Sequence, residues 1–249
     1  MTTLVKQPLK EDIVYPESDG KPMSENTKQY EWIVTIKENL EALLPNAFIA
    51  ADLFWYPVQN RPRIVQAPDV MVAIGRPKGH RGSYKQWEEG NIAPQVVFEI
   101  LSPSNSGIEM LRKLEFYRQY GVGEYYVYDP ETEGLFGYTR LNDSLQAVEN
   151  ISGWVSLILG IRFEPSPDGL AIYYPDGRRF LTFQELLSQA ENERQRAENE
   201  RQRAENERQR AENERQRAEN EHQRAEDERQ RAEKLAAKLR EMGIDPTQI

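Results

Sequence analysis

The sequence contains no cysteine, which excludes both a disulfide framework and a thiolate metal site. Histidine is scarce as well, because His80 and His222 are the two in the chain, and this argues against a histidine-rich zinc site. Nowhere do about 18 apolar residues follow one another without a charge. The amino-terminal residues MTTLVKQPLKEDIVYP also lack the apolar run of a signal peptide. We therefore expect a soluble, cytoplasmic protein without a membrane partner.

Basic residues are fewer than acidic ones, with 32 Lys and Arg against 41 Asp and Glu, which gives a net charge of −9. Residues 190–249 hold 14 of the basic and 16 of the acidic residues, so most of the excess lies in residues 1–189. An acidic balance argues against a broad electrostatic affinity for nucleic acid. Basic residues nevertheless gather in one stretch, at Arg61, Arg63, Arg76, Lys78, Arg81 and Lys85. This stretch could contact a phosphate backbone, or its charges could simply be solvated in a loop.

The chain divides by composition into three regions. Residues 1–22 carry prolines at positions 8, 16 and 22 with little apolar periodicity, which predicts an extended arm. Residues 23–181 are long enough for one domain with a well-filled core. Residues 182–249 predict a long charged helix that begins after Thr182 as N-cap, and AENERQR repeats there every seven residues from Ala190.

The repeated tail has the period of a coiled coil, but only one position per heptad is apolar, and it is alanine. A stable coiled coil needs two apolar positions per heptad, so the expected seam is weak. Helix propensity and pairs such as Glu191 with Arg194 are expected to hold the helix instead. Larger apolar residues return near both ends, at Phe183, Leu186 and Leu235, where the rest of the chain, a second copy or a protein partner could bind. A solvated rod is the alternative.

Residues 23–181 have the pattern of a mixed α/β domain. The apolar spacing and turn residues predict, in order, a helix over 25–44 with Ser24 as N-cap, extended segments over 48–56 and 63–74, a loop over 75–91 with a short helix near Trp87, a buried strand over 94–101, a helix over 106–120 and a strand over 122–130. The last three segments imply a parallel pair of strands joined by a right-handed crossover. Alternating segments beyond residue 130 imply an antiparallel β extension.

Three charged residues stand out within this order. Asp69 follows a proline at the start of an apolar run, where a bond to its own turn would be the ordinary explanation. Glu99 lies inside VVFEIL, and burying a carboxylate there costs several kcal/mol unless it is paired or binds a metal. Glu109, Lys113 and Tyr117 follow at steps of four, on one face of the predicted helix. Because that helix starts soon after the Glu99 strand ends, Lys113 could reach the Glu99 carboxylate.

Two acids and a lysine are the smallest set of side chains that a divalent-metal phosphodiesterase needs. The acids can bind Mg²⁺, while the lysine orients the attacking water or stabilises the negative charge of the phosphate. The linked segments PDVMVAI, VVFEILSPSN, E-x-x-x-K-x-x-x-Y and GVGEYYVYDP resemble the PD-(D/E)XK nuclease superfamily, and within it the Uma family of restriction endonucleases. The resemblance covers about residues 20–180. It implies a restriction-endonuclease-like mixed sheet flanked by helices in the order αβββαβ.

The resemblance assigns roles to residues of this chain. Asp69 matches the motif aspartate and Glu99 the motif glutamate, and these two with the backbone carbonyl of Ile100 would be the metal ligands. Leu101 stands where the superfamily usually has a lysine, and Lys113 on the following helix matches the displaced lysine of the family.

The roles of Glu109 and of the acids in the first helix are less well defined by the resemblance. Glu109 occupies a place that the family commonly fills with aspartate. An acid of the first helix often assists in the superfamily, and Glu25 and Glu31 are both candidates, since spacing does not decide between them.

Two functions of different classes follow. The first is a Mg²⁺-dependent endonuclease that hydrolyses DNA phosphodiester bonds, with Asp69, Glu99 and Lys113 as catalytic residues and, as the resemblance suggests, a homodimeric assembly. The second is a catalytically inactive nuclease-like module that binds or scaffolds a partner through its helical tail. The order of the motifs favours the first, whereas the acidic charge, the displaced lysine and the tail favour the second.

Overall fold

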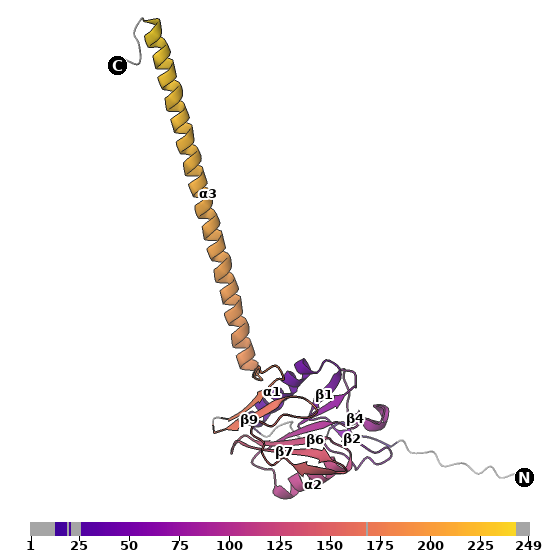
Figure 1. Cartoon of the computed structure of the whole chain (residues 1–249). Coiled ribbons are helices and arrows are strands. Elements are labelled where there is room, and N and C mark those ends of the chain that lie inside the picture. The colour runs from indigo at the N-terminus through magenta and orange to yellow at the C-terminus, as the bar shows by residue number, and fades with distance from the viewer. Residues whose placement is uncertain (1–12, 19, 21–25, 168, 243–249) are drawn as a thin grey trace, which may run out of the picture. The chain divides into compact units, whose positions relative to one another are not determined.

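A computed structural model describes residues 13–18, 20, 26–167 and 169–242 of the chain. Two compact units are present, Met1–Glu185 and Leu186–Ile249. Along the chain the described elements are α1 (Thr27–Leu43), β1 (Ala47–Ala51), β2 (Trp55–Tyr56), β3 (Val70–Ile74), β4 (Tyr84–Lys85), the 3₁₀ helix η1 (Gln86–Glu88), β5 (Val96–Ile100), α2 (Gly107–Gln119), β6 (Glu124–Asp129), β7 (Gly134–Leu141), β8 (Ser144–Ala147), β9 (Arg162–Ser166), β10 (Gly169–Tyr173) and α3 (Phe183–Glu241) (Figure 1).

The first unit is built on a six-stranded mixed sheet with the strand order β1-β3-β5-β6-β7-β8. β5 and β6 are parallel and α2 connects them, which confirms the crossover predicted from the sequence. The other neighbouring strands of this sheet are antiparallel. The series α1, β1, β3, β5, α2, β6 therefore reproduces the expected αβββαβ order, and β7 and β8 form the antiparallel extension. β9 and β10 make a separate hairpin.

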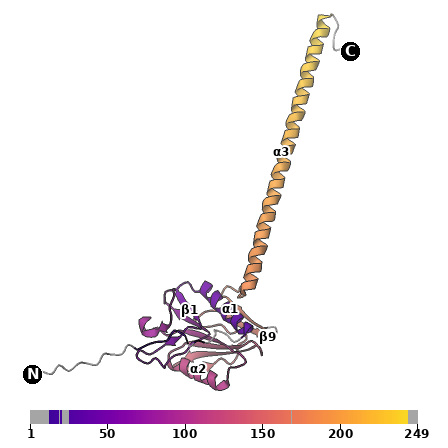
Figure 2. The same ribbon diagram turned by 180° about the vertical axis from the view of Figure 1, so that it is seen from behind.

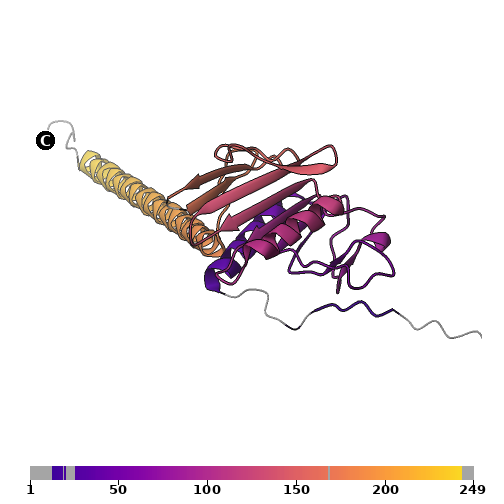
Figure 3. The same cartoon turned by 90° about the horizontal axis from the view of Figure 1, so that it is seen from below.

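Each face of the central sheet has its own apolar core. α1 and the β9–β10 hairpin cover one face through residues such as Ile33, Ile36 and Phe163, and α2 covers the other through Tyr117. In Figures 1 and 2, α1 lies above the sheet beside β9 while α2 lies below it. Seen from below, α2 runs alongside the strands (Figure 3). Because helices cover both faces, β5 is buried along its whole length, as its continuous apolar run predicted.

Side-chain caps fix where the helices begin. The Asn26 Oδ1 atom accepts a hydrogen bond from the Gln29 backbone N–H over 2.8 Å, so Asn26 is the N-cap of α1. The predicted cap, Ser24, lies outside the described residues. α2 begins after Ser106, whose hydroxyl accepts from the Glu109 N–H over 3.2 Å.

The predicted N-cap of the long helix is confirmed. Thr182 and Glu185 form a reciprocal capping box, because the Glu185 N–H donates to the Thr182 hydroxyl and the Thr182 N–H donates to the Glu185 carboxylate. Within α3, all described side chains from residue 186 to residue 235 are exposed. None of the helices in the described part of the chain is both long enough and apolar enough to cross a membrane.

Two extended segments are shorter than the sequence predicted. The segment 48–56 is not one strand, because β1 ends at Ala51 and Asp52 takes a left-handed backbone conformation with φ 47°. β2 then pairs with β4 instead of the central sheet. Within 63–74, only Val70–Ile74 forms a strand of the sheet. The segment 75–91 contains the predicted short helix, at η1, but it also contains the strand β4, which was not predicted.

The described part of the amino-terminal arm packs on this β2–β4 region. The Tyr15 ring lies 5.1 Å from the rings of both Tyr56 and Trp87. The Tyr56 hydroxyl donates a hydrogen bond to the Pro16 carbonyl over 2.6 Å. Residues 1–12, 19 and 21–22 of the predicted arm lie outside the described residues.

Candidate active site

A buried ion pair joins β5 to α2. The Glu99 side chain points from β5 toward α2 and is 2% exposed, while the Lys113 side chain is 12% exposed. The Lys113 Nζ atom lies 2.7 Å from the Glu99 Oε2 atom. The structure thus brings together two residues that lie 14 positions apart in the sequence. Their meeting follows from the crossover, which returns α2 over the strand it has just left.

Tyr117 holds the other oxygen of the Glu99 carboxylate. The Tyr117 hydroxyl donates a hydrogen bond to Glu99 Oε1 over 2.5 Å, and this tyrosine is fully buried. Burial and the charge of Glu99 raise the pKa of Tyr117 well above its usual value, so the hydroxyl keeps its proton and remains a donor. Sequence analysis placed Tyr117 on the helix face of Lys113 but gave it no role, although the spacing of four residues was the available signal.

Asp69 completes a group of two acids and one cation. It directly precedes β3, and because β3 runs antiparallel to β5, it lies near the end of β5. The Asp69 Oδ2 atom accepts a hydrogen bond from the Ile100 N–H over 2.6 Å. Burial and then the negative charge of Glu99 raise the pKa of Asp69 well above its ordinary value, against the opposing effect of Lys113. Two neighbouring carboxylates therefore compete for a single positive charge.

Lys113 remains charged in this setting. Burial by itself would lower the pKa of its amine, but the charges of Glu99 and Asp69 outweigh burial, and the pKa is raised. Lys113 is therefore a hydrogen-bond donor and a positive charge at neutral pH. Glu109 is half-buried and adds to the field on Lys113. Leu101, where the superfamily usually has a lysine, packs in the core beneath α2.

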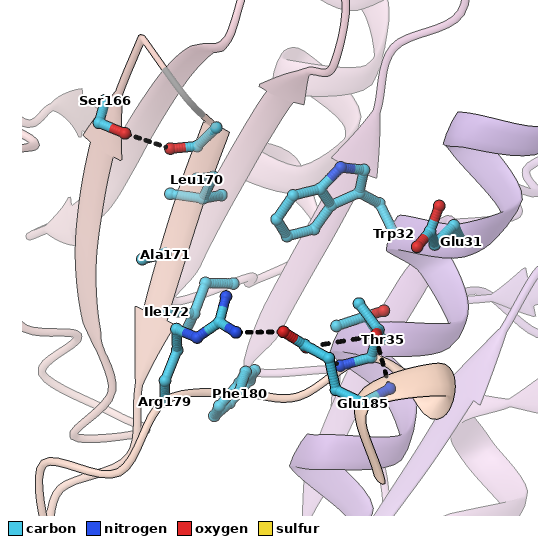
Figure 4. A pocket seen from close by; sticks show the side chains of 12 residues that line it. Glu31, Trp32, Thr35, Ser166, Leu170, Ala171, Ile172, Arg179, Phe180 and Glu185 are labelled. Carbon is cyan, nitrogen blue, oxygen red and sulfur yellow. Dashed lines mark hydrogen bonds and ion pairs between the residues drawn. The ribbon is translucent and has the colours of Figure 1, made fainter. Parts of the chain in front are cut away.

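The residue of the first helix that reaches the site is Gln29. Its side-chain amide donates to the Ile100 carbonyl over 2.9 Å. Glu31 instead lines a pocket of about 370 Å³ on the opposite face of the sheet, with Trp32 of the same helix and the Arg179–Glu185 ion pair (Figure 4). Of the two candidate acids of the first helix, Glu31 thus lies in this pocket, and Glu25 lies outside the described residues.

The donor set of this site can be compared with what a metal ion requires. Among the residues that the structure describes, no three or more His, Cys, Asp or Glu side chains form a group that could hold a metal. Mg²⁺ is commonly bound through one or two carboxylates, with water and substrate phosphates completing its shell. Asp69 and Glu99 supply two carboxylates whose mutual repulsion a cation would relieve. Each oxygen has a second lone pair beyond the hydrogen bonds described. These residues fit a hard divalent cation.

A second buried carboxylate, Glu124 at the start of β6, has different surroundings. It accepts hydrogen bonds from the backbone N–H groups of Leu157 and Ile158, over 2.6 Å and 3.2 Å. The hydroxyls of Ser156 and Tyr126 also donate to it. These donors anchor the turn at 156–159 to the sheet, so Glu124 has a structural environment, and sequence analysis did not single it out.

The chain matches the model of a protein family and is similar to solved structures. Residues 12–166, which include Asp69, Glu99 and Lys113, match the model of the Uma2 family, described as a putative restriction endonuclease. No curated protein matches the chain. Among solved structures, the chain is similar to a crystal structure of a putative nuclease belonging to DUF820 from Anabaena variabilis. The two share 18% sequence identity, with a TM-score of 0.40, over 60% of this chain and 86% of the other.

Proposed function

The chain belongs to the Uma2 restriction endonuclease family, and from this premise we propose that it is a Mg²⁺-dependent endonuclease that hydrolyses phosphodiester bonds in DNA. The observation that supports the proposal most is the group formed by Glu99, Lys113 and Asp69, in which two acids adjoin one buried lysine. A structural ion pair alone would need one acid. The second acid, Asp69, has a raised pKa and forms no ion pair among the residues that the structure describes. A carboxylate perturbed by burial and by a neighbouring charge is a candidate for a functional site.

In this proposal Asp69 and Glu99 would hold the metal ion, together with the carbonyl of Ile100, which also accepts the hydrogen bond from Gln29. When bound, the ion supplies positive charge that screens the scissile phosphate and makes water more acidic. Lys113 carries a proton at neutral pH, so it orients the attacking water or stabilises the negative charge that develops on the phosphate. Tyr117 fixes the orientation of the Glu99 carboxylate.

The experiment is a cleavage assay on supercoiled and linear DNA with Mg²⁺, Mn²⁺ or EDTA. Glu99→Gln is expected to lower the rate by about 10²-fold or more, the size seen when one group that stabilises the transition state is lost. The variant should stay folded, because removing one of two neighbouring negative charges relieves their repulsion. Glu131→Gln is the matched control, since Glu131 forms an exposed pair with Lys28 and should leave cleavage unchanged.

A negative result has a definite meaning. If the folded wild-type chain leaves every form of DNA intact with either metal, the endonuclease proposal is wrong. The second candidate is then a catalytically inactive binding or scaffolding module. The observation in its favour is that Lys113 and Tyr117 already engage both oxygens of Glu99.

A further inference from the structure

The outer face of α2 exposes large apolar side chains beside the candidate active site. Ile108 is 65% exposed and Leu111 is 67% exposed. Together with residues 63–65 and Phe116 they line a groove of about 530 Å³. Adjacent apolar residues exposed to this degree mark a surface that another molecule covers.

The same groove carries positive charge. Arg63 and Arg112 line it, both are exposed, and neither forms an ion pair with any residue that the structure describes. Its one acid, Glu115, pairs with Arg118 over 2.6 Å. The groove therefore presents two cations without ion-pair partners among the described residues, on a chain whose net charge is −9.

Two basic residues of the loop over 75–91 have hydrogen-bond partners already. Arg81 donates to both carboxylate oxygens of Glu89 over 2.5 Å and 3.2 Å. Lys78 donates to the Glu41 carbonyl over 3.0 Å, so these cations hold the loop in place. The loop over 75–91 begins after Ile74, at the end of β3 that is opposite Asp69. Five residues of strand, at 3.3–3.4 Å per residue, separate Asp69 from Ile74 by about 17 Å. The loop over 75–91 is for these reasons a weaker candidate for binding a polyanion than the α2 groove.

Two parts of the groove adjoin residues of the candidate active site along the chain. Arg112 directly precedes Lys113 on α2, and residues 63–65 lead within a few positions to Asp69. From these positions, and resting on the proposed nuclease function, we propose that the α2 groove binds the DNA backbone next to the cleaved bond. Arg63 and Arg112 contact phosphates there, and Ile108 and Leu111 pack against the sugars.

A second copy of this chain fits the groove less well than DNA. A two-fold contact would set the patch against itself, since such an interface uses the same surface on both subunits. Arg63 and Arg112 of both copies would then come together in one interface, with Glu115 already paired. A polyanion meets these charges without that repulsion.

The test measures binding of the full-length chain to a short fluorescent DNA duplex at several salt concentrations, without divalent metal. Arg63→Gln/Arg112→Gln should flatten the slope of log affinity against log salt by about 1.8, because each phosphate that an arginine neutralises contributes about 0.9 to that slope. The matched control is Lys78→Gln/Lys85→Gln, which removes two charges from the loop and should leave the slope unchanged. Ile108→Ser/Leu111→Ser should weaken binding at every salt concentration and keep the wild-type slope.

The outcomes separate this inference from the proposed function. Equal slopes for the wild type and the arginine variant, or an effect confined to the loop variant, would overturn the inference and leave the endonuclease proposal standing. A wild type that binds no duplex even at low salt also overturns the inference, and the cleavage assay with metal then decides the endonuclease proposal separately. If Leu111→Arg converts a dimer into a monomer in sedimentation, the groove is instead an interface between copies.

Discussion

Glu99 and Glu124 are both buried carboxylates, but their partners differ in how easily they can be exchanged. Backbone N–H groups of a packed turn bind Glu124, and they cannot leave without unfolding that turn. Two side chains of one helix face, Lys113 and Tyr117, bind Glu99. A lysine amine on a flexible stem can move aside or share a carboxylate with a metal ion. The environment at Glu99 is therefore suited to chemistry and the one at Glu124 to stability.

Asp69→Asn should change how stability depends on pH. The pKa of Asp69 is raised by folding, so the folded chain keeps this proton at pH values where the unfolded chain, with a pKa of about 3.9, has lost it. The free energy of unfolding should accordingly fall as pH rises between the two pKa values. Asparagine removes this contribution, so the variant should exceed the wild type in stability above that interval. Urea unfolding in EDTA at a series of pH values measures the free energy of unfolding of both proteins. Parallel curves of this free energy against pH for the two proteins would contradict the prediction.

Tyr117→Phe should destabilise the fold by about 1–3 kcal/mol, because a buried oxygen of Glu99 loses its donor. Chemical denaturation measures the change. Tyr120→Phe serves as control, since the Tyr120 ring packs on Phe116 but its hydroxyl has no hydrogen bond within the described residues. Equal effects of the two substitutions would show that the bond to Glu99 contributes nothing.

Part of the site could be predicted from the sequence because it lies within one strand–helix–strand unit. Local rules place Lys113 and Tyr117 on one helix face and return that face to Glu99. The role of Gln29 could not be predicted, although it shares the helical spacing of the buried Ile33 and Ile36. Which residue of the first helix reaches the end of β5 depends on how that helix is rotated on the sheet, and rotation is a property of packing.

At the level of elements too, what local sequence signals determine was predicted correctly, and what packing between distant segments determines was not. The buried strand β5 and the helix α2 were predicted correctly, because a continuous apolar run and a helical spacing of apolar residues are signals that act within a few residues. The break of 48–56 at Asp52 was missed. Its aromatic and β-branched residues suit a strand, but Trp55 is fully buried against Phe116 and Tyr117 under α2. Packing with a helix remote in sequence overrides the local propensity there.

Glu124→Gln should loosen the connection between β6 and the turn at 156–159. The amide has one acceptor oxygen in place of two, so it can accept from the Leu157 and Ile158 N–H groups or from the Ser156 and Tyr126 hydroxyls, but not from all four donors. Hydrogen bonds to charged groups contribute about 1.5–3 kcal/mol each, so we expect a decrease of at least about 2 kcal/mol in the free energy of unfolding.

Hydrogen exchange locates this decrease in stability. The amides of Leu157 and Ile158 should exchange faster in Glu124→Gln than in the wild type, while those of β3 keep their relative order of protection. A variant with unchanged protection at these two amides would mean that Glu124 does not hold the turn.

For the whole molecule, the tail is expected not to be the main dimerisation element. Counting from each alanine of the array, the residue three positions later is glutamate, at residues 193, 200, 207, 214, 221 and 228. In a parallel pair of helices these glutamates would face one another in the seam, which is destabilising. We therefore predict that a chain ending at Gln189 still forms a dimer through its first unit and still binds metal. Light scattering decides this, and a clean monomer after truncation of a dimeric full-length chain would contradict it.

The seven-residue repeat of α3 also makes the length of this helix variable in fixed steps. Gain or loss of one repeat changes the helix by about 10.5 Å, at 1.5 Å per residue. Seven residues are almost two whole turns, so one end of the helix rotates by only about 20° relative to the other. The distance between Leu186 and Leu235 can thus be adjusted by whole repeats while their side chains keep nearly the same relative direction. Tandem duplication or deletion in the gene is enough to change the reach of the helix without redesigning either end.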